Sequence, residues 1–80
     1  METDAVEQLI RDGMPGARAT VTGDGSHFDA VVVSDDFSGK SLLQRQRLVM
    51  ATVKPQIESG DLHALSIKTF TPEQWAEQGG

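Results

Sequence analysis

The 80-residue sequence contains no cysteine, and this absence limits the chemistry that the chain can perform alone. Without thiols, the chain can build neither a disulfide framework nor a thiolate metal site from its own residues. Long hydrophobic runs are also missing, since stretches such as Ala30–Val33 are far shorter than the roughly 20 residues that a membrane span requires. The N-terminal segment Met1–Asp4 is acidic, where a secretory signal would be basic. We therefore expect a soluble, cytoplasmic protein.

Acidic residues are absent from the middle of the chain. Between positions 37 and 57 there is no aspartate or glutamate, although the net charge of the whole chain is −5. The cations of this segment are Lys40, Arg45, Arg47 and Lys54. Lys40, Arg47 and Lys54 are spaced by seven and would share one face of a continuous helix. The segment is either a solvated helix flank or a contact surface, and both interpretations remain open at this point.

Hydrophobic periodicity and capping signals predict helices near both ends of the chain and in its middle. Asp4 and Glu7 have the spacing of a capping box, and the apolar stripe Val6–Ile10 follows before Gly13 ends the helix. Near the C-terminus, Thr71-Pro72 followed by Gln74 predicts a short last helix that holds Trp75.

The central helical region is expected to begin at a second capping box, formed by Ser41 and Gln44. Pro55 cannot donate a backbone hydrogen bond and crowds the preceding turn, so we expect a kink or a break into two helices near it. The apolar face is expected to carry Leu42, Val49, Met50, Val53 and Ile57.

Segments 17–22, 28–34 and 64–69 are predicted to be strands, the first two joined by the turn-forming residues Gly23–His27. The order is then α-β-β-α-α-β-α. A right-handed helical crossover makes the second and third strands parallel, whereas the first two form an antiparallel hairpin. We expect residues 1–80 to form one α+β domain, a three-stranded mixed sheet covered by helices, with the topology of the second class of KH-like domains.

The stretch Gly39-Lys40-Ser41 lies between a strand and a helix, which is the layout of a phosphate-binding loop. The complete loop needs a glycine where Ser34 stands, and the two aspartates that follow Ser34 would repel a polyphosphate. We therefore interpret the stretch as the start of a helix, in which Gly39 supplies the bend and Ser41 the cap.

The blocks "VVVSDDFSGKSLLQRQRLV" and "LHALSIKTFTPEQW" together resemble the BolA family, and "GDGSHF" is most similar to its short-loop IbaG (YrbA) branch. The resemblance covers about residues 23–75, in order and at matching spacings. It implies a KH-like fold, partnership with a monothiol glutaredoxin and a [2Fe–2S] cluster shared between the two proteins. Some members are described as DNA-binding transcriptional regulators, so DNA is a second class of partner that the resemblance implies.

The sequence departs from the family pattern at three places. Gln46 stands where many members have a histidine between two arginines, and Pro55 interrupts the long helix. Asp24 occupies about the position at which many members carry a cysteine or histidine in the hairpin loop. His27, at the end of this loop, is the residue that can substitute as a ligand.

The two histidines are the candidate metal ligands, and the predicted topology places them near each other. If the second and third strands are parallel neighbours, His27 and His63 lie at the same sheet edge, because each stands at the start of a strand. The resemblance also matches His63 to the family's histidine in the "HAL" block. Two imidazoles cannot supply the roughly four protein ligands of a cluster, so a partner must bring thiolates. The alternative is that His27 merely ends the hairpin and His63 is a partly buried strand residue.

Catalytic interpretations of the sequence are weak. Asp24, Ser26 and His27 are residue types of a catalytic triad, but neighbours in a tight turn cannot align nucleophile, base and orienting group. We therefore expect a non-enzymatic partner of a monothiol glutaredoxin, with His63 and His27 at a shared [2Fe–2S] cluster. The alternative is a nucleic-acid-binding regulator, whose contacts would come from Lys40, Arg45, Arg47 and Lys54.

Overall fold

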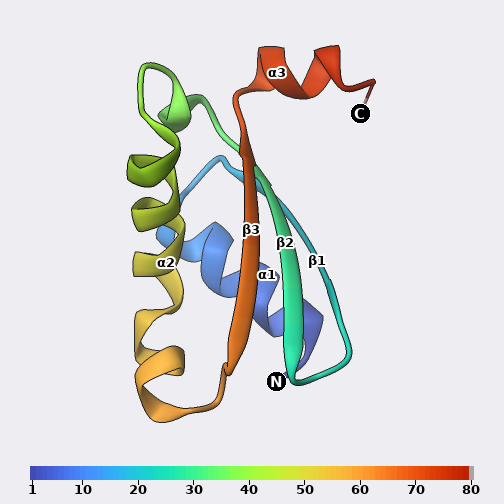
Figure 1. The fold of residues 1–80 in the computed structure, drawn as a ribbon, viewed down its shortest axis with the longest axis vertical. Helices are drawn as coiled ribbons and strands as arrows, with labels where there is room; N and C mark the ends of the chain where they lie inside the picture. The colour runs from blue at the N-terminus through green and yellow to red at the C-terminus, as the bar shows by residue number, and fades with distance from the viewer. Residues whose placement is uncertain (80) are drawn as a thin grey trace.

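The computed structural model describes residues 1–79 and contains one three-stranded sheet with helices packed against it (Figure 1). Its elements, in chain order, are α1 (Thr3–Gly13), β1 (Arg18–Gly23), β2 (His27–Val33), a short 3₁₀ helix (Asp35–Phe37), α2 (Leu42–Ser59), β3 (Ala64–Phe70) and α3 (Pro72–Glu77). None of these helices combines the length and the apolar character that crossing a membrane requires. The α+β class and the mixed sheet covered by helices, both predicted from the sequence, are confirmed.

The sheet has the strand order β1-β2-β3 and contains one antiparallel and one parallel pair. β1 pairs with β2 antiparallel, from Arg18 opposite Val33 to Gly23 opposite Phe28. β2 pairs with β3 parallel, and the helix α2 makes the crossover between them. Both pairings agree with the predicted topology. Where the end of a strand differs from its predicted position, the difference is one residue.

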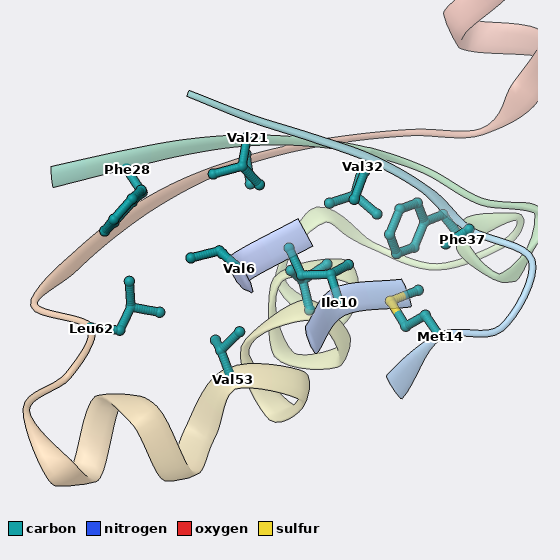
Figure 2. Close-up of a cluster of buried hydrophobic side chains, with 13 residues drawn as sticks. Val6, Ile10, Met14, Val21, Phe28, Val32, Phe37, Val53 and Leu62 are labelled. Atoms are coloured by element: carbon teal, nitrogen blue, oxygen red, sulfur yellow. The ribbon is translucent and has the colours of Figure 1, made fainter. Parts of the chain in front are cut away.

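The core lies between one face of the sheet and the helices α1 and α2. Side chains alternate along a strand, so Phe28, Ala30 and Val32 of β2 all point to this face and are fully buried. Figure 2 shows Phe28 and Val32 on the side of the sheet where Ile10 of α1 and Val53 of α2 lie. The buried cluster comprises Val6, Ile10, Met14, Ala17, Ala19, Val21, Phe28, Ala30, Val32, Phe37, Val49, Val53 and Leu62. The opposite face of the sheet is left to solvent over most of its length, as the exposure of Thr20, Thr22 and Lys68 shows.

Pro55 does not divide the central helix, and the expected pair of helices is wrong: α2 is one helix from Leu42 to Ser59. The proline removes one backbone hydrogen bond of the helix. On either side of it, however, Val53 is fully buried and Ile57 packs against the core. Because both side chains need the helical geometry to reach the sheet, packing outweighs the loss of one bond. The observed helix and strand order is therefore α-β-β-α-β-α.

Two of the three predicted capping boxes are present. Ser41 and Gln44 cap α2 reciprocally, and Thr71 and Gln74 cap α3 in the same way. The box expected from Asp4 and Glu7 is wrong, since α1 starts after Glu2 and has no side-chain cap. The Glu7 carboxylate instead accepts a hydrogen bond from the Val21 amide of β1 at 3.0 Å, besides its ion pair with Arg11 at 2.6 Å. A contact between a helix and a strand thus takes the place of the expected local cap.

The expected apolar face of α2 is correct at Val49 and Val53 but wrong at Leu42, which is 70% exposed. The buried line of the helix continues instead to Arg45, which is only 7% exposed. Its guanidinium carbon lies 5.8 Å from the centre of the Phe37 ring, which is itself fully buried. Phe37 and the stem of Arg45 fill the space beneath the first turn of α2, so Leu42 stays on the solvent side.

We expect the substitutions Val49→Ala and Leu42→Ala to have very different effects on stability. Val49 is fully buried, so removing its two methyl groups should lower the free energy of unfolding by about 2 kcal/mol. Leu42→Ala should stay within about 0.5 kcal/mol of the wild type, because the side chain is exposed and alanine favours helix. Urea denaturation followed by circular dichroism measures both values. A loss at Leu42 as large as that at Val49 would contradict the observed orientation of the helix.

Candidate functional site

The strands β2 and β3 begin at the same edge of the sheet (Figure 1), and the two histidines stand at these two starting points. His27 is the first residue of β2 and stands opposite Ala64, the first residue of β3, in the parallel pairing. His63 directly precedes Ala64 along the chain. The prediction that the second and third strands begin at the same edge of the sheet is therefore confirmed for the backbone. We name this region the histidine edge, consisting of His27, His63 and the loop Asp24–Ser26.

His63 has an exposed side chain on a firmly held segment of backbone. Its neighbour Leu62 is 1% exposed and belongs to the core cluster. The Leu62 amide also donates a hydrogen bond to the Gln56 carbonyl oxygen of α2 at 3.0 Å. The buried leucine therefore fixes where the chain leaves α2 and turns into β3. His63 is presented to solvent at this point, and the alternative of a partly buried strand residue does not hold.

His27 is about half exposed and lies on the sheet face opposite the core. Its side chain is 54% exposed, and its Nε2 atom lies 3.7 Å from a carboxylate oxygen of Asp29, two residues along the same strand. At this distance the interaction is a loose ion pair when the imidazole is protonated and no hydrogen bond otherwise. The ring nitrogens of His27 are therefore accessible to a further partner.

The loop before His27 is held by Asp24, a role that the sequence did not predict. The Asp24 carboxylate accepts hydrogen bonds from the amides of Ser26 at 3.0 Å and His27 at 2.9 Å, and from the Ser26 hydroxyl at 3.1 Å. These bonds, that of the His27 amide first, lower the pKa of Asp24 from 3.8 to about 2. Asp24 thus positions the backbone of His27, and its carboxylate is engaged within the loop.

Gly23 makes the tight approach at the start of this loop possible. A Cβ atom at this position would collide with the carbonyl oxygen of His27 and with the ring of Phe28. The Asp24 amide closes the turn by donating a hydrogen bond to the same His27 carbonyl at 3.2 Å. Glycine therefore allows the two strands to meet directly beside His27.

Gln46 links α2 to the strand that follows the histidine edge. Its side-chain amide donates a hydrogen bond to the Ile67 carbonyl oxygen at 2.9 Å, across 21 positions of sequence. β3 is an edge strand, so this carbonyl has no neighbouring strand to bind. Sequence reasoning singled out Gln46 as a departure from the family pattern but did not identify this contact, because no local signal reports it.

The structure gives different roles to the four cations of the basic segment. Arg45 is used inside the fold: its Nε donates to the Lys40 carbonyl at 3.1 Å and its Nη1 to the Gln74 side chain at 2.9 Å. The Lys40 ammonium donates to the Asp36 carbonyl at 2.9 Å, while Arg47 and Lys54 are exposed on α2. Lys40, Arg47 and Lys54 are thus available to a partner, whereas Arg45 fastens α3 to the start of α2.

The Gly39-Lys40-Ser41 stretch starts a helix, as interpreted from the sequence. Gly39 has a φ of +76°, a left-handed conformation that favours glycine, and the Ser41 hydroxyl accepts a hydrogen bond from the Gln44 amide. The Ser34 hydroxyl likewise accepts from the Asp36 amide at 3.0 Å and caps the 3₁₀ helix. These side chains satisfy the backbone of the chain itself, which leaves no phosphate-binding loop here.

Within residues 1–79, no group of three or more histidine, cysteine, aspartate or glutamate side chains is arranged to hold a metal ion. A donor set made of two imidazoles fits a shared site, in which a second protein supplies the remaining ligands. It does not fit a cluster that this chain holds alone.

Comparison with known proteins gives consistent matches to one family. The sequence profile described as "BolA-like protein" matches residues 8–74. The acid stress protein IbaG of Escherichia coli K12 is 33% identical over 76 residues, covering 95% of this chain and 90% of that protein. Among solved structures, a BolA homologue from Coxiella burnetii has a TM-score of 0.88 at 39% identity, covering 95% of this chain and 97% of the other.

A second similar structure is a domain of a differently named protein. The BolA domain of SufE1 from Arabidopsis thaliana has a TM-score of 0.76 at 30% identity. The match covers 89% of this chain and 92% of that domain. The similarity extends over most of the chain in every one of these comparisons, and the family profile, over residues 8–74, spans the histidine edge.

The pH dependence of the hairpin loop follows from Asp24. Because the pKa of Asp24 in the folded protein is lowered to about 2, the stabilisation of the loop is fully present above about pH 4, the ordinary pKa of aspartate. It is lost as the pH falls through 2. NMR titration should show the Ser26 and His27 amides shifting with a midpoint near 2, and Asp24→Ala should speed hydrogen exchange at the His27 amide.

The matched control for this titration is Asp29→Asn. Asp29 lies on the same face of the sheet as His27, but its carboxylate accepts no hydrogen bond from the loop amides. It should leave the midpoint unchanged. An ordinary titration of Asp24 near pH 4 that leaves the His27 amide undisturbed would show that the carboxylate does not hold the loop.

Proposed function

The chain belongs to the BolA family, and we propose that it acts as a non-enzymatic partner of a monothiol glutaredoxin. The two proteins would share a [2Fe–2S] cluster, in a role in iron–sulfur or iron homeostasis. The observation that carries this proposal is the histidine edge, where two accessible imidazoles stand at the start of two paired strands in a chain without cysteine.

The ligands that this chain offers support a cluster that is shared with a partner protein and not one that this chain holds alone. A cluster takes about four ligands from protein, and His63 and His27 supply at most two of them. The remaining ligands would be thiolates, which this chain lacks and which a thiol protein provides. When bound, a cluster with imidazole in place of thiolate has a raised reduction potential, which suits sensing or transfer better than low-potential electron carriage.

The rigidity of the histidine edge supports His63 as the principal ligand. His63 follows the buried Leu62 and precedes a strand that pairs along its whole length with β2. Its position is therefore set by the core, whereas its side chain faces solvent and meets an approaching partner. His27 is held by the loop bonds of Asp24, which makes it a second, more adjustable donor.

The relatives support a role that depends on another protein. The Arabidopsis structure is a BolA domain of SufE1, so this fold also occurs as one part of a larger protein. Nothing in the geometry of the described residues assembles a nucleophile, a base and an orienting group. The chain is best explained as a binding module whose site becomes complete only in a complex.

Binding to DNA is the competing function, and the exposed Lys40, Arg47 and Lys54 are the observation in its favour. Arg45, the fourth expected contact, is buried and bonded to Gln74. The exposed cations also lie beside apolar side chains of α2, which contacts with phosphate groups do not require. We therefore rank the shared cluster above the nucleic-acid role.

His63→Ala should weaken the complex with a monothiol glutaredoxin while leaving the fold intact. The side chain is exposed, so the free energy of unfolding should change by about 0.5 kcal/mol or less. The cluster would lose a ligand that no nearby cysteine replaces, so the visible absorption and circular dichroism of the co-expressed complex should change. Acidification should have the same effect on the wild type, because imidazole binds metal in its neutral form.

Two further variants make this experiment specific. His27→Ala should give a smaller version of the same loss, and Lys68→Ala, a change at an exposed position of β3, should give none. If the His63→Ala complex forms with an unchanged spectrum and stability, His63 is not the ligand.

A further inference from the structure

One flank of α2, next to its buried line, carries apolar side chains that the chain itself covers only in part. The buried residues of the helix are Arg45, Val49 and Val53, and its solvent-facing side bears two shallow hollows of about 260 and 290 Å³. Both hollows are bordered by Arg47 and Ala51, so they adjoin each other and follow the helix axis. We call this surface the outer face of α2; its principal residues are Lys40, Leu43, Arg47, Met50, Lys54 and Ile57.

The apolar residues of the outer face form a line along the helix. Leu43, Met50 and Ile57 are spaced by seven, which places them above one another on successive pairs of turns. Leu43 is 59% exposed and Met50 is partly exposed, whereas Ile57 is half-buried and also packs against the core. A large exposed aliphatic side chain that continues such a line is typical of a surface that another protein covers.

A line of cations runs beside the apolar line. Lys40, Arg47 and Lys54 share the same spacing of seven and precede Leu43, Met50 and Ile57 by three positions each. The ion pairs among residues 1–79 are Arg11–Glu7 and the loose His27–Asp29 contact, so Arg47 and Lys54 have no carboxylate partner within this part of the chain. α2 contains one carboxylate, that of Glu58 near its C-terminal end, so cations outnumber acidic side chains on this surface although the net charge of the chain is −5.

The apolar line and the line of cations have the spacing against which a second helix can pack. An apolar seam repeated every seven residues, flanked by charges, is the pattern by which helices pack side by side at a shallow angle. The partner helix that complements it has its own apolar line and carries glutamate or aspartate beside that line. α2 has 18 residues, which corresponds to about 27 Å of contact length.

A second copy of this chain does not complement the outer face through the same surface. A symmetric contact would place Lys40, Arg47 and Lys54 of one α2 against the same cations of the other. A nucleic acid would satisfy the cations but would leave the line Leu43, Met50 and Ile57 without an apolar partner. We propose that the outer face of α2 docks an acidic amphipathic helix of a partner protein, at a surface that contains neither histidine.

The test uses a synthetic fluorescent peptide of 18 residues, with leucines at helical seam spacing and glutamates flanking them. We expect it to bind the full chain, to shift backbone NMR signals along α2, and to leave those of β1 unshifted. The double variant Arg47→Glu/Lys54→Glu should weaken binding about tenfold or more, since attractive pairs become repulsive. Leu43→Ser should also weaken binding, because it removes an apolar contact without changing charge.

Matched controls separate this contact from general attraction between opposite charges. Lys68→Glu makes the same reversal at an exposed lysine of β3 and should change the affinity by about twofold or less. A peptide in which lysines replace the glutamates should not bind. Equal losses for Lys68→Glu and Arg47→Glu/Lys54→Glu, or NMR shifts located on other elements, would overturn the proposal.

Competing partners are measured with the same protein. If a short DNA duplex shifts the α2 signals with a log–log salt slope of about −0.9 per phosphate while the acidic peptide does not bind, the surface recognises nucleic acid and the proposal is wrong. It is equally wrong if sedimentation shows self-association that Leu43→Ser abolishes. Since His63→Ala should leave peptide binding unchanged, the result is independent of the proposed cluster.

Discussion

The parallel pairing of β2 with β3 is the constraint on which the rest of the structure depends. It extends from His27 opposite Ala64 to Val33 opposite Phe70. Because side chains alternate along a strand, a shift of this register by one residue would turn Phe28 and Val32 out of the core. The burial of the core therefore determines the register, and the register determines that both histidines lie at one edge. The geometry of the histidine edge is therefore a consequence of the packing of the core.

Local signals explain what the sequence could predict. The capping residues of α2 and α3 act within four positions, and alternation of apolar residues acts along a single strand, so both are visible without knowledge of tertiary contacts. The parallel topology followed from the helical crossover that joins the second and third strands, a connection typical of parallel neighbours. The place of the histidine edge followed from that topology, before any contact was known.

The features that could not be predicted depend on residues far apart in the sequence. Glu7 binds the amide of Val21, and Gln46 binds the carbonyl of Ile67; each contact satisfies a backbone group on an outer edge of the sheet. Pro55 was misjudged because its local penalty was weighed without the packing of α2 on the sheet. The hydrogen bonds of Asp24 lie within four residues, and its role was missed because turn-forming residues were considered only for their backbone preferences.

The molecule brings its distinctive side chains to two surfaces, and in the functions proposed here another protein completes each of them. At the histidine edge, His27 and His63 lack the thiolates that an iron–sulfur cluster needs. On the outer face of α2, Arg47 and Lys54 have no carboxylate partner among residues 1–79, and Leu43 is 59% exposed. Both surfaces of this 80-residue chain are thus accessible to another protein.

The central claim, that His63 ligates a shared cluster, is tested most directly by hyperfine spectroscopy of the complex with a monothiol glutaredoxin. This chain is labelled with ¹⁵N only in its histidines, the partner is left unlabelled, and the reduced, paramagnetic cluster is examined by electron–nuclear double resonance. The account predicts a strong ¹⁵N coupling from a directly bound imidazole, which in the His63→Ala complex falls to no more than the weaker contribution of His27. A reduced cluster whose spectrum shows no ¹⁵N coupling from this chain would contradict the account.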